Sequence, residues 1–281
     1  MKIVRYGLPG EERPGLIDSD GAIRDLSLLI PDIDFGYTPD LLKIVSQTDS
    51  GSLPMVPGSP RLGCPVAKIG KFIGIGLNYR DHAIEAKLAI PDEPAVFMKT
   101  TSCIQGPNDP IVLPRHSVKT DWEVEVGVVI GKKAKYVDEV TALDCIAGYC
   151  AINDVSERSF QFERGITMDK GKGCDTFGPI GPWLVTADEI PDPANLSMWL
   201  DVNGKRMQSG NTRDMIFSIA KIVSYLSEFM SLLPGDVIAT GTPAGVGFGM
   251  RPPMYLKSDD VIHIGVEGLG EQRQVVVGWQ P

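Results

Sequence analysis

The stretch KTDWEVEVGVVIG, residues 119–131, joins a row of acids to an apolar run that suits a buried strand. Side chains alternate across a β-strand, so Asp121, Glu123 and Glu125 are expected on one face and the apolar residues between them on the other. Acids beside a buried run are costly unless a cation compensates them. On a solvated edge strand they would need no partner, and this stretch alone leaves both alternatives open.

A further acid ends another apolar strand, within GYCAINDVSERSFQ, residues 148–161. Asp154 stands where this strand turns polar, either as a metal ligand or as the cap of a helix over the residues that follow. Carboxylates without nearby Cys or His favour a hard cation, Mg²⁺ first and Mn²⁺ or Ca²⁺ after it. One hypothesis is therefore a divalent-cation site at Glu123, Glu125 and Asp154.

Apolar runs typical of strands recur through the rest of the chain, whereas residues 212–233 show helical spacing and end at Pro234-Gly235. Many strands with few helices predict a β-rich α+β fold rather than repeated βαβ units. The stripe expected to face the core from this helix comprises Ile216, Ile219, Ile222, Val223, Leu226, Phe229 and Met230.

The N-terminal part reads as a separate small unit. Residues 2–28 suit short strands, and a helix is expected near 38–47. The stretch rich in Ser, Pro and Gly at 48–63 is typical of a linker. We therefore predict a small N-terminal α/β domain with its linker at 1–65 and a catalytic domain at 66–281.

Composition excludes several partners. The chain has 27 Lys and Arg against 36 Asp and Glu, a net charge of −9, and no basic stripe, so nucleic acid is not expected. Its start lacks a basic and apolar leader, and no run approaches the roughly 18 apolar residues of a membrane span, so we expect a cytoplasmic protein without membrane contact. The five cysteines form no C-x-x-C pair and suggest small buried apolar residues rather than disulfides or zinc ligands.

The segment GIGLNYRDHAIEA, residues 74–86, predicts a strand followed by a short helix with Asn78 as its cap. His82 and Glu85, three residues apart, would share one face of that helix. A carboxylate beside an imidazole fixes its tautomer and raises its basicity, as a general base requires. The alternative is a surface histidine in a helix ion pair, and Asp81 is expected to cap the same helix.

Two glycine-rich loops could complete a site. Residues 163–173, ERGITMDKGKG, resemble a mobile lid in which Lys172 could oppose a developing anion or merely be solvated. Residues 240–249, TGTPAGVGFG, offer backbone N–H groups and the Thr242 hydroxyl to an oxyanion or a carboxylate. Neither this loop nor the one at 74–79 has the spacing of a dinucleotide or phosphate loop, so nucleotide binding is not expected.

In combination these motifs resemble the fumarylacetoacetate hydrolase family over residues 66–281. The resemblance rests on N-Y-x-x-H-x-x-E, the E-x-E strand, N-D-x-S-x-R-x-x-Q, the lid lysine and T-G-T-P-x-G-V-G, and the ordered combination is far more specific than any one motif. It implies a rolled mixed β-sandwich, a homodimer and a divalent cation, with a 2,4-dioxo acid as substrate. The implied roles are metal ligands Glu123, Glu125 and Asp154, a catalytic dyad of His82 and Glu85, a charged partner at Lys172, and substrate contacts from Gln161 and Thr242.

Within the family, the opening at 4–18 and an insertion at 248–260 make the chain look like bacterial hydrolases of 2,4-diketo-3-deoxy sugar acids of the rhamnonate and fuconate types. The resemblance therefore implies Mg²⁺-dependent C–C hydrolysis that releases pyruvate and a hydroxy acid such as lactate. Alternatives are a ureidoglycolate lyase, an oxaloacetate decarboxylase, a dioxo-acid isomerase, or a non-catalytic metal-binding scaffold. Some members have a further metal ligand at the position of Asp81, so its role stays open.

Overall fold

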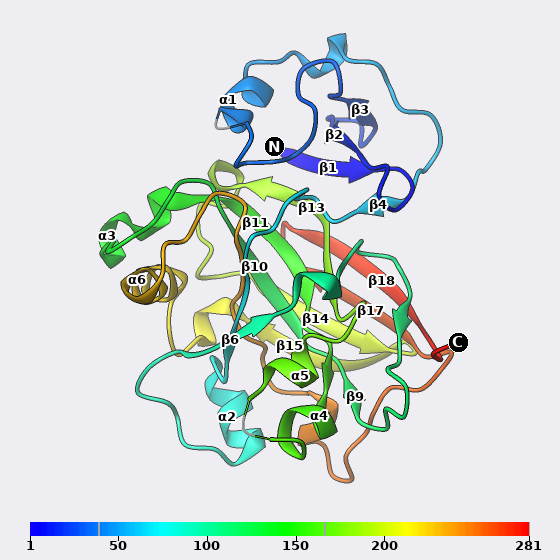
Figure 1. The fold of residues 1–281 in the computed structure, drawn as a ribbon, viewed down its shortest axis with the longest axis vertical. Coiled ribbons are helices and arrows are strands. Elements are labelled where there is room, and N and C mark those ends of the chain that lie inside the picture. The colour runs from blue at the N-terminus through cyan, green and yellow to red at the C-terminus, as the bar shows by residue number, and fades with distance from the viewer. Residues whose placement is uncertain (39, 166, 281) are drawn as a thin grey trace.

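The computed structural model describes residues 1–38, 40–165 and 167–280, and within them the fold is β-rich with mixed sheets (Figure 1). The largest sheet has the strand order β3-β2-β1-β13-β11-β10-β16-β5-β6, with β4 paired to β1 and β7 paired to β13. A second sheet has the order β15-β14-β17-β18-β8, and β12 pairs with β9 in a small third one. The predicted β-rich α+β class is confirmed.

The elements have the following bounds. The strands are β1 Lys2–Tyr6, β2 Arg13–Ile17, β3 Ile23–Asp25, β4 Leu62–Gly63, β5 Phe72–Gly76, β6 Ala95–Lys99, β7 Ile104–Gln105, β8 Ile111–Val112, β9 Thr120–Asp121, β10 Val124–Ile130, β11 Ile146–Asn153, β12 Ser156–Glu157, β13 Gly178–Thr186, β14 Ser197–Val202, β15 Lys205–Asn211, β16 Val237–Ala239, β17 Val261–Val266 and β18 Gly270–Val277. The α-helices are α1 Leu41–Ser46, α2 Arg80–Ala86, α3 Glu139–Ala142, α4 Arg158–Phe162, α5 Asp169–Lys172 and α6 Ile219–Phe229.

Strands β10 and β11 form the buried centre of the largest sheet. They are antiparallel, with Val124 opposite Asn153 and Glu125 opposite Ile152, and every residue of both strands is buried. This register brings the acidic start of β10 beside the polar end of β11. Asp121, Glu123 and Glu125 were expected on one face of a single strand. Asp121 instead belongs to the separate strand β9, which pairs with β12.

The N-terminal strands extend the largest sheet, since β1 pairs with β13 through Lys2 opposite Val185 and Ile3 opposite Leu184. They lie at one end of the molecule, at the top of Figure 1, with α1 beside them. Helix α1 falls inside the range expected at 38–47, of which residue 39 lies outside the described residues. The division into domains at 1–65 and 66–281 stays a prediction.

Helix α6 is shorter than expected. Residues 212–214 form a 3₁₀ turn, and α6 begins after Ser218, whose hydroxyl accepts the N–H of Lys221 at 3.2 Å. The predicted apolar stripe is buried at Ile219, Ile222, Val223 and Leu226. Phe229 was expected in the core but is 59% exposed; it is the last residue of α6, and its ring packs edge-on against Tyr225.

The prediction that Asn78 caps α2 is wrong, because the helix starts after Tyr79 and has no side-chain cap. The Asn78 amide instead donates to the carbonyls of Thr240 at 2.8 Å and Phe217 at 3.1 Å, and its oxygen accepts the Phe217 N–H at 2.8 Å. The buried Asn78 side chain therefore ties together the three chain segments that surround the end of β5.

Helices α2, α4 and α5 gather at the end of the molecule opposite the N-terminal strands, together with the segment that follows β16 (Figure 1). Among the described residues, no helix is both long enough and apolar enough to span a bilayer.

Candidate active site

Three buried carboxylates converge beside the end of β11. Glu123, Glu125 and Asp154 each offer one oxygen within 4.8 Å of the others. Strand β10 carries Glu125, and the residues just outside β10 and β11 carry the other two. The Asp154 N–H donates to the Glu123 carbonyl at 2.9 Å, which fixes the two turns against each other. The hypothesis that these three side chains would meet is consistent with this geometry.

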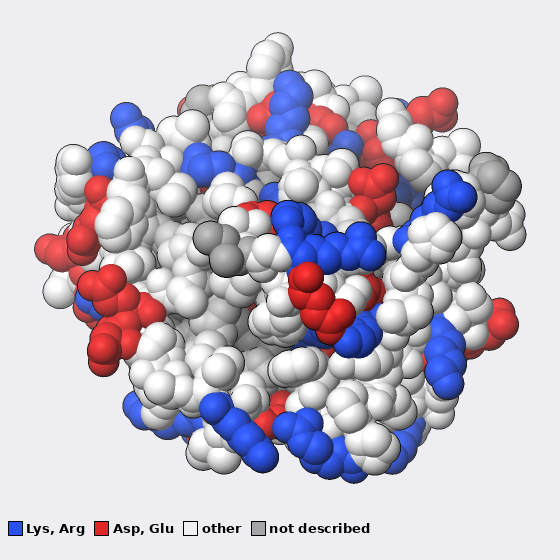
Figure 2. All heavy atoms as spheres, turned by 60° about the horizontal axis from the view of Figure 1, so that its bottom comes forward, with Lys and Arg blue, Asp and Glu red and all other residues white. Residues whose placement is uncertain are grey.

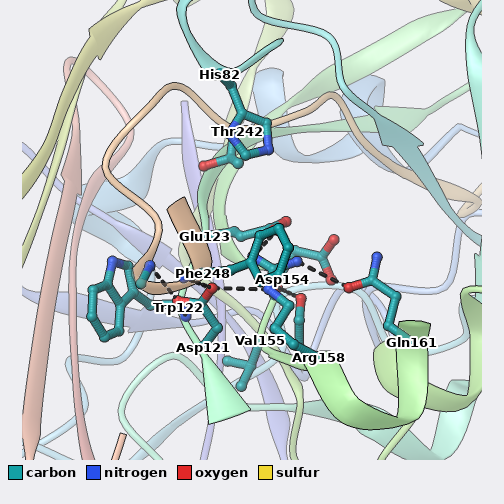
Figure 3. Close-up of polar contacts among 12 residues, drawn as sticks. His82, Asp121, Trp122, Glu123, Asp154, Val155, Arg158, Gln161, Thr242 and Phe248 are labelled. Carbon is teal, nitrogen blue, oxygen red and sulfur yellow. Dashed lines mark hydrogen bonds and ion pairs between the residues drawn. The ribbon is translucent and has the colours of Figure 1, made fainter. Parts of the chain in front are cut away.

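Three buried cations surround the carboxylates. Lys172 Nζ lies 2.6 Å from both Glu123 Oε2 and Asp154 Oδ2. Lys99 Nζ lies 2.6 Å from Asp154 Oδ1, and it also donates to the carbonyl of Lys172. The guanidinium of Arg158 lies 2.7 Å from Glu123 Oε1 and 2.8 Å from an oxygen of Asp121 (Figure 3). The structure therefore places the Lys172 ammonium against two of the three carboxylates.

The three carboxylates differ in how well they are neutralised. Burial opposes the ionisation of Glu123, but Lys172 and Arg158 hold its pKa well below the usual range. Burial, together with the neighbouring charges of Asp154 and Glu123, raises the pKa of Glu125 well above its usual value. Glu125 accepts the Gly241 N–H at 2.7 Å, which offsets part of this cost. Of the three acids, Glu125 is thus the one that forms no ion pair with a Lys or Arg in the described part of the chain.

The donor set fits a hard divalent cation. Counting Asp121 with the three carboxylates gives four acids, and the cations paired with them are Lys99, Arg158 and Lys172, which leaves one negative charge. The raised pKa of Glu125 shows where that charge is least stable. A divalent cation beside three carboxylate oxygens would compensate it.

His82 and Glu85 are paired on α2, as their spacing predicts. His82 Nδ1 lies 3.3 Å from Glu85 Oε2, and the Glu85 carboxylate accepts the Gly245 N–H at 3.0 and 3.1 Å. His82 lines the same cavity as Glu123 and Glu125, and its charge when protonated bears on Glu123 (Figure 3). An imidazole paired with a carboxylate therefore lines the cavity that holds part of the acidic cluster.

Asp81 lies apart from the acidic cluster. Its carboxylate accepts the N–H of the adjacent His82 at 2.7 Å and the Ala244 N–H at 3.3 Å. Among the described residues, the acids close enough together to hold a metal ion are Glu123, Glu125 and Asp154, and Asp81 is not one of them. Asp81 thus joins the first turn of α2 to the loop after β16.

Gln161 and Thr242 both line the cavity, and their side chains form different hydrogen bonds. The side-chain oxygen of Gln161, Oε1, accepts a hydrogen bond from Arg158 Nη1 at 3.0 Å. The Thr242 hydroxyl donates to the Val124 carbonyl at 2.9 Å and accepts from Gln208 Nε2 at 2.8 Å. In this arrangement Thr242 can accept a further hydrogen bond, but its proton is not available to an oxyanion.

The cavity has a volume of about 230 Å³. Figure 2 brings this end of the molecule forward and shows a hollow among uncharged atoms beside a group of charged side chains. The expected lid at 163–173 begins directly after α4 and contains α5, and its residue 166 lies outside the described residues. Three residues of the site were not predicted from the sequence. Lys99 binds Asp154, and Phe162 and Phe248 contact each other at the mouth of the cavity.

Fold and site together define an enzyme built around a buried acidic cluster and a nearby histidine. Residues 71–277 match the family described as Fumarylacetoacetate (FAA) hydrolase C-terminal. This chain belongs to that family. A Burkholderia multivorans protein that carries only a general, provisional hydrolase name is 59% identical over 98% of both chains.

Two solved structures show the range of activities among similar proteins. The maleylpyruvate hydrolase of Sphingobium sp. SYK-6, in complex with manganese(II) and pyruvate, is 30% identical with a TM-score of 0.83, over the whole of both chains. The 2-hydroxyhepta-2,4-diene-1,7-dioate isomerase of Mycobacterium marinum is 32% identical with a TM-score of 0.76, also over the whole of both chains. Such relatives are hydrolases or isomerases, so the chain is an enzyme of a family that binds a divalent metal.

Proposed function

We propose that this enzyme hydrolyses the C3–C4 bond of a 2,4-dioxo acid of the acylpyruvate type and releases pyruvate. The observation that carries the proposal is the position of His82, which faces the same cavity as Glu123 and Glu125. A hydrolase of this kind needs a cation for the dioxo-acid end of the substrate and a base for water. Both requirements meet in this one cavity.

Glu123, Glu125 and Asp154 are the proposed ligands of the cation, with Mg²⁺ preferred over Mn²⁺ and Ca²⁺. When bound, the cation supplies positive charge to the C1 carboxylate and the 2-oxo oxygen of the substrate. Lys172 already bridges two of the carboxylates, so its ammonium adds positive charge beside the same end of the substrate.

His82 is the proposed general base. Glu85 holds Nδ1, which leaves Nε2 to take a proton from water as the water oxygen attacks the C4 carbonyl. Lys172 offsets the negative charge that develops on the substrate. Breaking C3–C4 then leaves the electron pair on the pyruvate fragment, and the proton held by His82 can return to it. The products are pyruvate and the carboxylic acid of the acyl part.

More specifically, we propose that the substrate is a sugar acid. This proposal is supported by the resemblance of residues 4–18 and of the insertion at 248–260 to bacterial hydrolases of 2,4-diketo-3-deoxy sugar acids. The substrate would be a 2,4-diketo-3-deoxy sugar acid of the rhamnonate or fuconate type, and the products pyruvate and lactate. A dioxo-acid isomerase is the second candidate, because the isomerase from Mycobacterium marinum shares the fold across its whole chain. The same base could move a proton between carbons without adding water.

A coupled assay tests the proposal. The purified enzyme with Mg²⁺ or Mn²⁺ is given a panel of 2,4-dioxo acids, including 2,4-diketo-3-deoxyrhamnonate and acetylpyruvate, and pyruvate is measured by its enzymatic reduction. We expect one pyruvate for each substrate consumed, and loss of activity in EDTA that either metal restores. Consumption of substrate without pyruvate would support the isomerase instead, and no reaction with any substrate would refute both.

We also propose that the enzyme works as a homodimer, as the family resemblance implies. Sedimentation equilibrium of the full chain tests this point, and a single species at the monomer mass of 30.4 kDa would contradict it.

A further inference from the structure

Two aromatic rings from distant segments meet at the mouth of the cavity. Phe162 ends α4, and Phe248 lies in the 3₁₀ turn Gly247–Gly249 after β16. Their ring centroids are 5.2 Å apart, with the planes inclined by 32°. Both rings line the cavity, yet Phe162 is 51% and Phe248 36% exposed. Large apolar side chains left partly exposed at a site entrance are available to a ligand.

Phe248 is fixed to the acidic cluster through its backbone. The N–H groups of Gly247 and Phe248 donate to the two oxygens of Asp121 at 2.7 and 2.9 Å. Asp121 is fully buried and bound by Arg158, which also binds Glu123 (Figure 3). The position of the Phe248 ring is therefore set relative to the proposed metal ligands by a chain of buried charged hydrogen bonds.

The segment after Phe248 is anchored as well. The Met254 N–H donates to the Gly247 carbonyl at 3.0 Å, and the Leu256 N–H donates to the Thr120 carbonyl at 2.8 Å. A side chain at Gly247 would bring a Cβ to 1.9 Å from the Met254 carbonyl oxygen, so the backbone at Gly247 packs directly against the backbone at Met254. The insertion thus holds Phe248 as a built part of the cavity wall.

The wall changes from charged to apolar with distance from the cluster. On β6, Lys99 binds Asp154, Phe97 lies with its ring centroid 5.1 Å from Lys172 Nζ, and Ala95 follows two residues further out. Alternate residues of a strand share a face and stand roughly 7 Å apart, so this row leads from the cluster to the mouth. Besides Phe97, Phe162 and Phe248, the apolar residues that line the cavity include Leu77, Ala86, Leu88, Ala95 and Met168.

We propose that Phe162 and Phe248 form an aromatic gate that selects the acyl part of the substrate, favouring compact apolar acyl groups over charged or polyhydroxylated ones. The inference rests on the proposed function, because the dioxo-acid end must occupy the charged end of the cavity. The acyl part then lies along the apolar wall toward the two rings. The lactoyl group of the proposed sugar acid, with one hydroxyl and a terminal methyl, is compact enough for a cavity of about 230 Å³.

Specificity constants for three substrates test the gate: acetylpyruvate, butanoylpyruvate and succinylpyruvate, whose acyl part ends in a carboxylate. For the wild type we expect butanoylpyruvate to exceed acetylpyruvate by about fifteenfold in kcat/KM, since it has two more methylenes and each buried methylene adds a factor of about four. Succinylpyruvate should fall below butanoylpyruvate by on the order of a hundredfold, because a charge is costly to place on an apolar wall.

Phe248→Ala should reduce the ratio of butanoylpyruvate to acetylpyruvate by about fivefold, and Phe248→Leu by less, because leucine restores part of the apolar contact. Phe229→Ala removes an exposed ring from α6 and should leave the ratio unchanged. A ratio that stays at the wild-type value in both Phe248 variants would overturn the gate.

Calorimetric titration with the same acids in the presence of Mg²⁺ separates the gate from the reaction. If the wild type releases no pyruvate from any substrate, the proposed function fails. The gate still requires tighter binding of butanoylpyruvate than of acetylpyruvate, with a smaller difference in Phe248→Ala. Equal affinities for the two acids in the wild type would overturn the gate itself.

Discussion

His82 Nδ1 lies 3.3 Å from Glu85 Oε2, and Glu85 is itself held by the backbone N–H of Gly245 at 3.0 Å. The glutamate therefore connects a helix on one side of the cavity with a glycine-rich loop on the other. A histidine oriented in this way has one ring nitrogen committed and the other available for proton transfer.

His82→Asn should lower kcat by on the order of 10² to 10⁴, the usual range for loss of a general base. Glu85→Gln should lower it less, because the ring remains present but loses its carboxylate. Since the two residues act as a unit, the double variant should be scarcely worse than His82→Asn alone. Steady-state kinetics of the three variants measure this, and additive losses would indicate that the residues act independently.

Gly249→Ala should impair catalysis by displacing Glu85. A Cβ at this position would lie 2.3 Å from Glu85 Cδ, so the carboxylate must move away from His82 or from Gly245. We expect kcat to fall by on the order of tenfold while Mg²⁺ affinity, measured by calorimetry, stays at the wild-type value. In a Glu85→Gln background the same substitution should have a smaller effect on kcat. An equal effect in both backgrounds would show that Gly249 acts by another route.

Lys99→Met should destabilise the protein by about 3–5 kcal/mol, the range for removing one partner of a buried ion pair. Lys99 also donates to the Lys172 carbonyl, so the variant should loosen α5 and weaken metal binding. Urea unfolding and calorimetry measure the two effects. Lys71→Met is a suitable control, because Lys71 pairs with the buried Asp236 away from the cluster. It should lower stability and leave metal affinity intact; equal metal affinity in both variants would contradict a positioning role for Lys99.

Glu125→Gln should stabilise the metal-free protein by an amount that grows with pH. Burial and the charges of Asp154 and Glu123 raise the pKa of Glu125, so the folded state keeps a proton that the unfolded chain loses near pH 4.3. The stability cost of Glu125 is therefore absent below that pH and increases until the pH passes its folded-state pKa. Glutamine has no such cost, so the difference in Tm in EDTA should widen as pH rises from 4 to 8.

Divalent cations provide the complementary half of this test. Mg²⁺ or Mn²⁺ should raise the Tm of the wild type and have little effect on Glu125→Gln, which lacks a ligand charge. A pH-independent difference in EDTA, or equal stabilisation of both proteins by the cation, would contradict the assigned state of Glu125.

Parts of the site follow from local sequence and others do not. Period-two alternation places Glu123 and Glu125 on one face, and i, i+3 spacing pairs His82 with Glu85, because both rules depend on backbone geometry alone. Lys99 has no such signal: a lysine at the end of an apolar strand is usually solvated, and only the fold brings Asp154 to it. Phe162 and Phe248 lie 86 residues apart, and no periodicity relates them.

Two predictions about the helices were wrong for similar physical reasons. The helix predicted from residue 212 begins after Ser218, where a serine cap outweighs the apolar spacing before it. Asn78 has the residue type of a cap, but its buried amide satisfies the backbone of Phe217 and Thr240 instead. In both places the deciding contacts come from segments more than a hundred residues away or from competing local hydrogen bonds.

Anomalous diffraction at the manganese edge, from crystals grown with Mn²⁺ and pyruvate, shows directly whether the three buried carboxylates bind the metal. We expect one strong anomalous peak with oxygens of Glu123, Glu125 and Asp154 at about 2.0–2.6 Å, and pyruvate on the side that faces His82. No peak among these three carboxylates at millimolar Mn²⁺, or a peak held by other residues, would contradict this expectation.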